Sequence, residues 1–319
     1  MSDKEFPLVT IVACCYNHER FVEECLDSIR MQTYPNVQLI ITDDCSSDNS
    51  VAVINKWMVK HNVRCVFIVH EQNMGLPRTL NEALEYVAGK YVSLMSTDDI
   101  MMPRKIEEQT KIFESGPDDV GIVFSKSYFM DENGESLAYE PGEKWQNQYH
   151  EGYVLEHLLE RNFIIAPSML VRRSCYDRVG GYDTSLVYED YDMNLRIAEF
   201  YQFRYSDYVS ARYRVHGNSM ARSRSKKVQH SKIQIYFKWL ERKPELKELL
   251  EARITAMAKD LYEARHPRRN YFLWKAFVQS YRLSSLLMCA YSFLDIPYSC
   301  YDASMRAWGG FADFRRGRI

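Results

Sequence analysis

Two neighbouring carboxylates in the sequence have the right place for metal or phosphate chemistry. Asp98 and Asp99 directly follow the apolar run Tyr91–Met95. Adjacent carboxylates repel each other, and a hard divalent cation such as Mg²⁺ or Mn²⁺ offsets this repulsion and can bridge to phosphate oxygens. Asp pairs are also common in surface turns. Because this pair ends a run that is typical of a buried strand, we favour a site over a turn.

Two further acidic clusters could also do chemistry. The first, Asp43–Asp48, follows the apolar run Gln38–Ile41, and it could alternatively cap a helix that begins near Val51. The second is Glu189-Asp190, at the start of a predicted helix, where acidic residues are favoured by the helix dipole. A carboxylate held beside a substrate hydroxyl can remove its proton, and a base of this kind can itself lie at a helix start.

The elements around these clusters predict an α/β fold. Within the first 125 residues, apolar runs alternate with amphipathic helical segments, which indicates a doubly wound, mostly parallel sheet like that of Rossmann folds. Ligands of such sheets lie beyond the carboxyl ends of the strands. Three predicted strands end in or just before polar clusters, namely Tyr16-Asn17, Asp43–Asp48 and Ser96–Asp99. We therefore expect the site at this edge.

The pattern changes along the chain and predicts two domains. Residues 1–119 form the first half of the larger domain, residues 120–222 form a mixed α/β second half, and residues 223–319 form a helical, basic extension. Predicted strands in the second half span 121–129 and 168–171, and predicted helices span 153–160 and 190–200. Long charged helices are predicted over about 229–264.

The net charge of −2 conceals an uneven distribution. Residues 1–210 carry 34 acidic and 19 basic side chains, whereas residues 211–319 carry 9 acidic and 22 basic ones. This balance argues against a nucleic-acid binder coated in positive charge. The eight cysteines form no CxxC pair, which indicates a reducing, cytoplasmic compartment. Asp3 and Glu5 argue against a secretion signal, and the apolar run Leu283–Leu294 is too short to span a membrane.

Taken together and in order, six segments resemble the family 2 glycosyltransferases, which have the GT-A fold. The resemblance covers residues 7–222 and rests on VTIVACCYNHERFVEECLDSI, IITDDCSSDNS, NMGLPRTLNEALEYVAGKYV, SLMSTDDIMMP, GGYDTSLVYEDYDMNLRIAE and YRVHGNSM. It implies transfer of a sugar from a nucleoside-diphosphate-sugar, expected to be a UDP-sugar, to an acceptor hydroxyl. It also implies dependence on Mn²⁺ or Mg²⁺ and inversion at the anomeric carbon.

The resemblance assigns donor-binding roles in the first half of the domain. Tyr16 matches the residue that packs on the nucleobase, and Asp44 matches the acid that accepts a hydrogen bond from the base, with Asp43 as the alternative. Arg78 matches a basic residue near the diphosphate, and a solvated arginine at a helix start explains it equally well. Asn81 in the same motif is expected to be structural.

The metal is assigned to a segment that departs from the family pattern. Ser96 stands where the family usually has the first acid of Asp-x-Asp-Asp, so the ribose contact there is made by a hydroxyl. Asp98 matches the metal ligand, and Asp99 belongs to the same donor-binding cluster. His216 matches a late histidine that reaches the metal or the diphosphate, and imidazole is a competent ligand for Mn²⁺-like ions. The other seven histidines are interpreted as surface or core residues.

The catalytic base and the acceptor contacts fall in the second half of the domain. Asp190 is assigned as the base and Glu189 as the second choice. The family places acceptor contacts around Trp145, Tyr149 and residues 162–168, although these residues are equally consistent with a core.

The acceptor and the partners are inferred by analogy. The family analogy suggests a surface polysaccharide or a lipid-linked glycan as acceptor. A basic segment at residues 223–227 could contact the diphosphate or be a solvated loop. Cations then alternate with aromatic residues, which suits either peripheral contact with the anionic inner face of the cell membrane or a homodimer interface. The residues concerned are Arg268, Arg269, Trp274, Lys275, Arg282, Trp308, Arg315, Arg316 and Arg318. We predict no nucleic-acid partner.

Two other functions compete with a glycosyltransferase. A sugar-phosphate nucleotidyltransferase would need a glycine-rich basic loop after the first strand, and Cys14–Arg20 has none. A non-catalytic nucleotide- or glycan-binding subunit of a synthase complex is favoured only by Ser96. Asp98, Asp190 and His216 argue against it.

Overall fold

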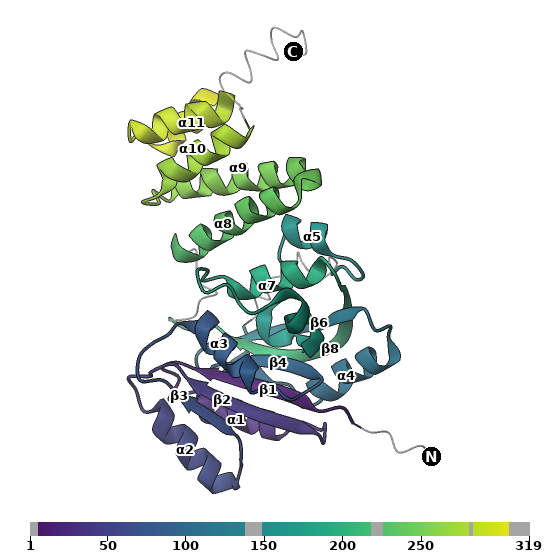
Figure 1. Ribbon diagram of the computed structural model, residues 1–319. Coiled ribbons are helices and arrows are strands. Elements are labelled where there is room, and N and C mark those ends of the chain that lie inside the picture. Colours follow the sequence, from purple (N-terminus) through teal and green to yellow (C-terminus); the bar gives the residue numbers. More distant parts are fainter. Residues whose placement is uncertain (1–5, 138–148, 218–225, 281–282, 306–319) are drawn as a thin grey trace. The chain divides into compact units, whose positions relative to one another are not determined.

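The computed structural model describes residues 6–137, 149–217, 226–280 and 283–305. The chain divides into two compact units, residues 1–222 and residues 223–319, which are described separately below. The first unit is α/β and the second is helical (Figure 1). The predicted GT-A-like fold class, with a mostly parallel central sheet and a helical C-terminal region, is confirmed.

The first unit is built on an eight-stranded sheet in the order β3-β2-β1-β4-β7-β6-β8-β5. The pairs of β1 with β2, β1 with β4, β2 with β3 and β6 with β8 are parallel, and the pairs that involve β7 or β5 are antiparallel. The strands are β1 Val9–Cys15, β2 Val37–Asp43, β3 Val66–Val69, β4 Tyr91–Ser96, β5 Ile100–Met101, β6 Val120–Met130, β7 Leu170–Arg172 and β8 Gln202–Arg214.

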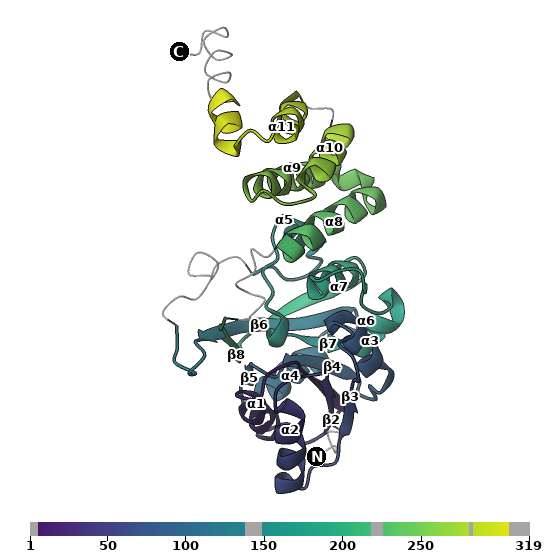
Figure 2. The same cartoon turned by 90° about the vertical axis from the view of Figure 1, so that its left-hand side faces the viewer.

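Helices cover both faces of this sheet, which explains why its central strands are apolar throughout. All seven residues of β1 are buried. One face packs on α1, α2 and α4 through a core that includes Leu26, Trp57 and Phe113, and α3 and α7 lie on the opposite side from α1 and α2 (Figures 1 and 2). The helices are α1 Val22–Arg30, α2 Ser50–His61, α3 Leu76–Glu85, α4 Lys105–Ser115, α5 Leu155–Glu160, α6 Arg173–Val179 and α7 Glu189–Ala198.

The second half of this unit differs from the sequence prediction in three elements, one of which is the short helix α6, Arg173–Val179, that was not predicted. The segment at 168–171 was predicted to be one strand, but Pro167 lies in a 3₁₀ turn, Ala166–Ser168, before the short strand β7 begins at Leu170. The thirteen-residue strand β8 was not predicted, since arginines and tyrosines interrupt its apolar alternation. It pairs with β6 in parallel and ends two residues before His216.

The second unit is a series of helices that pack in order along the chain (Figure 1). They are α8 Lys226–Arg242, a 3₁₀ turn at Pro244–Leu246, α9 Lys247–Glu263, α10 Arg269–Ser280 and α11 Leu283–Phe293. Their own core includes the buried side chains of Trp239, Ile254, Leu261 and Phe272. This unit therefore buries apolar surface of its own. Among the described helices of both units, none has the length and apolar character needed to cross a bilayer.

Candidate functional site

The polar clusters predicted to lie at one edge of the sheet do meet there. Cys15 at the end of β1 is in register with Asp43 of β2, and Cys14 is in register with Ser96 of β4. Two backbone hydrogen bonds continue this register beyond the strands, from Asp44 N to Cys15 O (3.0 Å) and from Thr97 N to Cys14 O (3.0 Å). The residues that follow these three strands are therefore neighbours.

Asp98 lies at the centre of a group of potential metal ligands. His216 Nε2 is 2.9 Å from Asp98 Oδ2, and His18 Nε2 is 3.8 Å from the same oxygen. The ligand atoms of these three side chains all lie within 4.8 Å of one another. Asp98 Oδ1 is buried and has no hydrogen-bond partner among the described residues. Burial acts to raise the pKa of Asp98. The hydrogen bond to His216 and the proximity of His18 outweigh this effect and hold the pKa below its ordinary value.

This donor set fits a divalent cation. A carboxylate oxygen and two imidazole nitrogens are ligands that Mn²⁺-like ions accept, and the buried Oδ1 of Asp98 is an acceptor that no described protein group satisfies. The Asp98 side chain is 12% exposed, so it lies largely out of contact with solvent.

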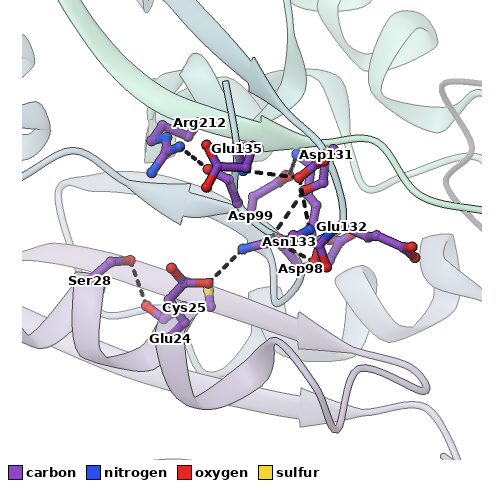
Figure 3. A network of polar contacts seen from close by, with 12 residues as sticks. Glu24, Cys25, Ser28, Asp98, Asp99, Asp131, Glu132, Asn133, Glu135 and Arg212 are labelled. Atoms are coloured by element: carbon purple, nitrogen blue, oxygen red, sulfur yellow. Dashed lines mark hydrogen bonds and ion pairs between the residues drawn. The ribbon is translucent and has the colours of Figure 1, made fainter. Parts of the chain in front are cut away.

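Arg214 holds the peptide of Asp98 and the end of β8 together. Its Nε donates to Asp98 O (2.7 Å), its backbone N–H donates to Asp99 Oδ1 (2.8 Å), and its Nη2 donates to Glu24 Oε2 (2.6 Å). Its Nη1 also contacts the carbonyls of Asp131 and Glu132, in the turn that Figure 3 shows beside Asp98 and Asp99. Arg214 is 2% exposed, so this clamp fixes the position from which His216 reaches Asp98.

Asp99 lies deeper in the protein than Asp98. Burial and the neighbouring charge of Asp98 raise the pKa of Asp99 well above its ordinary value. A protonated Asp99 relieves much of the repulsion that the sequence suggested for this pair. Asp99 Oδ1 accepts a hydrogen bond from the Arg214 backbone N–H, so Asp99 helps to hold β8 in place. Asp99 is only 2% exposed and has no exposed face for contact with a sugar donor.

Asp44 is held at the start of α3. Its Oδ1 accepts hydrogen bonds from Met74 N (2.7 Å) and from His70 Nδ1 (2.8 Å), and its Oδ2 accepts one from Gly75 N (2.9 Å). Gly75 has a φ of +82°, a backbone conformation that favours glycine. Asp44 Oδ2 accepts only one of these hydrogen bonds, so it has a second lone pair to which a nucleobase N–H could donate.

His70 connects Asp44 to a second carboxylate. Its Nε2 lies 2.9 Å from Glu82 Oε2, and its side chain is 8% exposed. Burial acts to lower the pKa of His70, but the hydrogen bonds to Asp44 and Glu82 outweigh this effect and raise it. His70 thereby fixes the orientation of the Asp44 carboxylate.

The other predicted donor-binding residues lie around Asp44. Asp43 is fully buried and accepts hydrogen bonds from Ser46 N (2.8 Å) and Ser46 Oγ (2.6 Å), so it shapes the loop after β2. Tyr16, directly after β1, is 47% exposed and is free to present its ring to a ligand. Arg78 and Ser96 are exposed, on the first turn of α3 and at the end of β4.

Glu189 and Asp190 are the first two residues of α7. Burial, and then the nearby carboxylates of Glu189 and Asp44, raise the pKa of the Cys14 thiol to about 12. Glu189 is therefore close to the end of β1. Burial raises the pKa of Asp190 to about 6, and burial with the neighbouring Asp190 raises the pKa of Glu189 to about 8. Both carboxylates therefore hold a proton more readily than free ones do, and either can accept one once it is deprotonated.

The segment before α7 is anchored to α3. Asn81 Nδ2 donates to Tyr182 O (2.9 Å), and Tyr182 N donates to Asn81 Oδ1 (2.6 Å). This agrees with the structural role expected for Asn81, and it ties the base-bearing segment to the half of the domain that contains Asp44. Asp192 forms an ion pair with Arg196 one turn later in α7 (2.8 Å), so it stabilises the helix.

The predicted acceptor region is partly described. Tyr149 stacks on Tyr205 with ring centroids 4.7 Å apart, and Asn162 Nδ2 donates to Tyr188 Oη (2.9 Å), next to Glu189. These contacts support the structural interpretation of both residues. Several residues named in the sequence analysis lie outside the described part of the chain: Trp145, residues 223–225, Arg282, Trp308, Arg315, Arg316 and Arg318.

Three residues of this site were missed or misread from the sequence: His18, His70 and Arg214. The interpretation of His18 and His70 as surface or core residues does not agree with their contacts to Asp98 and Asp44. No local pattern identifies them, because each partner is distant in the sequence. The available signal was positional, since His70 directly follows β3 and His18 is the third residue after β1, at the edge where the acidic clusters were expected.

Comparison with known proteins identifies the family. Residues 10–180, more than half of the chain, match the family described as glycosyl transferase family 2. The chain belongs to this family. This glycosyltransferase is 30% identical to an uncharacterized glycosyltransferase of Methanocaldococcus jannaschii over 230 residues, which cover 71% of this chain and 77% of the relative.

Two solved structures resemble the fold of this glycosyltransferase. A mannosyltransferase of Pyrobaculum calidifontis, in complex with GDP-Man and Mn²⁺, has a TM-score of 0.63 at 20% identity and covers 96% of this chain and 84% of its own. S. aureus TarS 1–349, in complex with UDP-GlcNAc, has a TM-score of 0.56 at 14% identity and covers 89% of this chain and 79% of its own. At these identities the likeness establishes the GT-A fold alone.

Proposed function

We propose that this glycosyltransferase transfers a sugar from a nucleoside-diphosphate-sugar to an acceptor hydroxyl in a metal-dependent, inverting displacement. The observation that carries the proposal is the buried Asp98 carboxylate, which has two imidazole rings beside it and one oxygen without a partner among the described residues. One solved structure of similar fold contains GDP-Man with Mn²⁺, and another contains UDP-GlcNAc. UDP- and GDP-sugars are therefore the first donors to test, and we expect a UDP-sugar.

The donor nucleoside would be held at the ends of β1 and β2. The exposed ring of Tyr16 can stack on a nucleobase, and Asp44 Oδ2 can accept a hydrogen bond from a base N–H. Ser96 is exposed beside them and can contact the ribose. Arg78 is exposed on the first turn of α3, where its charge suits the diphosphate.

Asp98 and His216 would hold the metal ion. When bound, a divalent cation stabilises the negative charge that develops on the departing nucleoside diphosphate. Arg214 keeps the Asp98 peptide and the strand that leads to His216 in fixed relation. Preorganised ligands of this kind need little rearrangement when the donor binds.

Asp190 would act as the base. Its carboxylate takes the proton of the acceptor hydroxyl as that oxygen attacks the anomeric carbon and the bond to the diphosphate breaks. Glu189, whose pKa is raised by burial and by the charge of Asp190, is the alternative base. The family analogy suggests a surface polysaccharide or a lipid-linked glycan as acceptor.

The test is a panel of UDP-, GDP-, dTDP- and CDP-sugars incubated with Mn²⁺, with release of nucleoside diphosphate as the readout. The proposal predicts turnover of at least one donor, through slow hydrolysis without acceptor and faster with lipid-linked saccharides. Asp190→Asn, which keeps the size and polarity of the side chain, should lose most of this turnover while still binding the donor. Binding of a donor without turnover under any condition would support a non-catalytic subunit instead.

A further inference from the structure

His18 lies beside Asp98 without a hydrogen bond to it. Its Nε2 is 3.8 Å from Asp98 Oδ2, which is too long for a hydrogen bond, and its side chain is only 14% exposed. His216 Nε2, by contrast, is at hydrogen-bonding distance from the same oxygen, 2.9 Å. A direct contact with Asp98 therefore does not explain the position of the His18 ring.

The other side of the His18 ring is engaged by Thr97. Nδ1 lies 2.9 Å from the hydroxyl of Thr97, a residue that is fully buried. When Nδ1–H donates to this hydroxyl, the lone pair of Nε2 points towards Asp98. Histidines that bind metals have this arrangement, in which the second ring nitrogen donates to a fixed oxygen and thereby sets the tautomer.

The backbone of His18 is also held in place. Its N–H donates to Ser50 Oγ (2.9 Å), at the start of α2. Its carbonyl accepts hydrogen bonds from Phe21 N and Val22 N (both 2.9 Å), at the start of α1. The ring is therefore fixed from both the backbone and the side chain, and this places Nε2 3.8 Å from Asp98 Oδ2.

We propose that His18 Nε2 is a third protein ligand, beside Asp98 and His216, of the cation that this enzyme uses. The set then contains two imidazole nitrogens and one carboxylate, and such a set favours Mn²⁺, Co²⁺ or Zn²⁺ over Mg²⁺, which prefers oxygen ligands. The proposal rests on the metal-dependent function proposed above. It adds the identity of a ligand and a preference among metals.

Metal binding can be measured on the full chain without turnover. Binding of Mn²⁺ alone is followed by the loss of the free-ion EPR signal, and Mg²⁺ is titrated in as competitor. Pulsed EPR of the bound Mn²⁺ detects coupling to coordinated imidazole nitrogens. His18→Asn is the informative variant, since its amide can keep the hydrogen bond to Thr97 but has no atom at the position of Nε2. His157→Asn, at an exposed histidine of α5, is the matched control.

The expected result is Mn²⁺ affinity lowered by about 10–100-fold in His18→Asn. The nitrogen coupling should fall from that of two imidazoles to that of one, His216, and the preference for Mn²⁺ over Mg²⁺ should become smaller. His157→Asn should bind as the wild type does. Wild-type affinity and nitrogen coupling in a folded His18→Asn would overturn the proposal while leaving the metal-dependent function intact. Failure of the wild type to bind Mn²⁺ would instead contradict the metal site itself.

Discussion

The carboxylates of the site differ in protonation because their surroundings differ. Asp98 has two imidazole rings beside it, which keep its pKa low, whereas the deeper Asp99 has burial and a neighbouring negative charge, which raise its pKa. Burial raises the pKa of both Asp190 and Glu189. Carboxylates whose pKa is raised towards the working pH can take up and release a proton there, as a general base must.

The pH dependence of turnover should report Asp190. The base must be deprotonated to accept a proton, so kcat should fall about tenfold for each pH unit below about 6. Asp190→Asn should lower kcat by about 10²–10⁴-fold and abolish this dependence, whereas the donor KM should change little. A pH profile of donor hydrolysis under saturating Mn²⁺ measures both.

Glu189→Gln is the matched control for this prediction. It removes the negative charge that a deprotonated Glu189 would place beside Asp190 but leaves the assigned base in place, so most of the turnover should remain. If Glu189→Gln were as inactive as Asp190→Asn and Asp190→Asn kept the pH dependence, the base would be Glu189.

His70 should act on nucleotide binding through Asp44. Loss of the Asp44 carboxylate in Asp44→Ala should weaken binding of the nucleoside diphosphate by about 10–100-fold, as expected for a hydrogen bond to a charged group. His70→Ala should weaken binding less and leave kcat nearly unchanged, because His70 only orients Asp44. Isothermal titration with UDP and GDP measures these affinities.

Glu82→Gln is the control for the second hydrogen bond of His70, which joins its Nε2 to Glu82. It removes a charge but keeps an oxygen that can accept from His70 Nε2, so nucleotide affinity should stay close to that of the wild type. Equal affinities of Asp44→Ala and the wild type would show that Asp44 does not contact the nucleotide.

At the level of elements, much of the first half of the catalytic unit could be predicted, because continuous apolar runs identify strands that helices cover on both faces. β1 ends at Cys15, directly before the Tyr16-Asn17 cluster at which the sequence predicted the end of a strand, and the edge where the acidic clusters meet follows from parallel pairing. β8 could not be predicted in the same way, since its burial alternates irregularly and its arginines suggest solvent. His18 and Arg214 act through partners that only the folded chain brings close.

The junction between α3 and the segment before α7 should be sensitive to added volume. A Cβ at Gly181 would lie 2.5 Å from Asn81 Oδ1, an atom that already accepts a hydrogen bond from Tyr182 N. Gly181→Ala should therefore lower the free energy of unfolding by about 1–3 kcal/mol. Urea denaturation of the variant measures this change.

A double variant tests the cause of this destabilisation. In Asn81→Ala the oxygen that obstructs the new methyl group is gone, so adding Gly181→Ala should cost clearly less than it does in the wild type. Strictly additive free energies would mean that the contact with Asn81 is not the cause.

At the level of the whole molecule, the uneven charge of the chain matches its division into units at residue 222. The acidic part contains the carboxylates of the site, and the helical unit is basic. On α10 of that unit, Tyr271, Trp274 and Val278 are exposed and fall on one helical face. Cations with exposed aromatic residues suit contact with an anionic bilayer, and this remains our proposal for the extension.

Vesicle sedimentation tests this proposal. The full chain should pellet with vesicles that contain phosphatidylglycerol more than with neutral phosphatidylcholine vesicles, and added salt should weaken the effect. Tyr271→Ser combined with Trp274→Ser should reduce pelleting severalfold without lowering donor hydrolysis, and Tyr86→Ser, at an exposed tyrosine of the catalytic unit, should not. Unchanged pelleting of the double variant would exclude this face of α10, and a concentration-dependent increase in mass without vesicles would indicate a dimer.

The central claim is that Asp98 lies at the metal centre of sugar transfer, and donor turnover with and without a divalent cation tests it most directly. We predict that EDTA abolishes release of nucleoside diphosphate from the preferred donor, that Mn²⁺ restores it, and that Asp98→Asn remains inactive at every Mn²⁺ concentration that saturates the wild type. Turnover that persists in EDTA, or full activity of Asp98→Asn, would contradict the account.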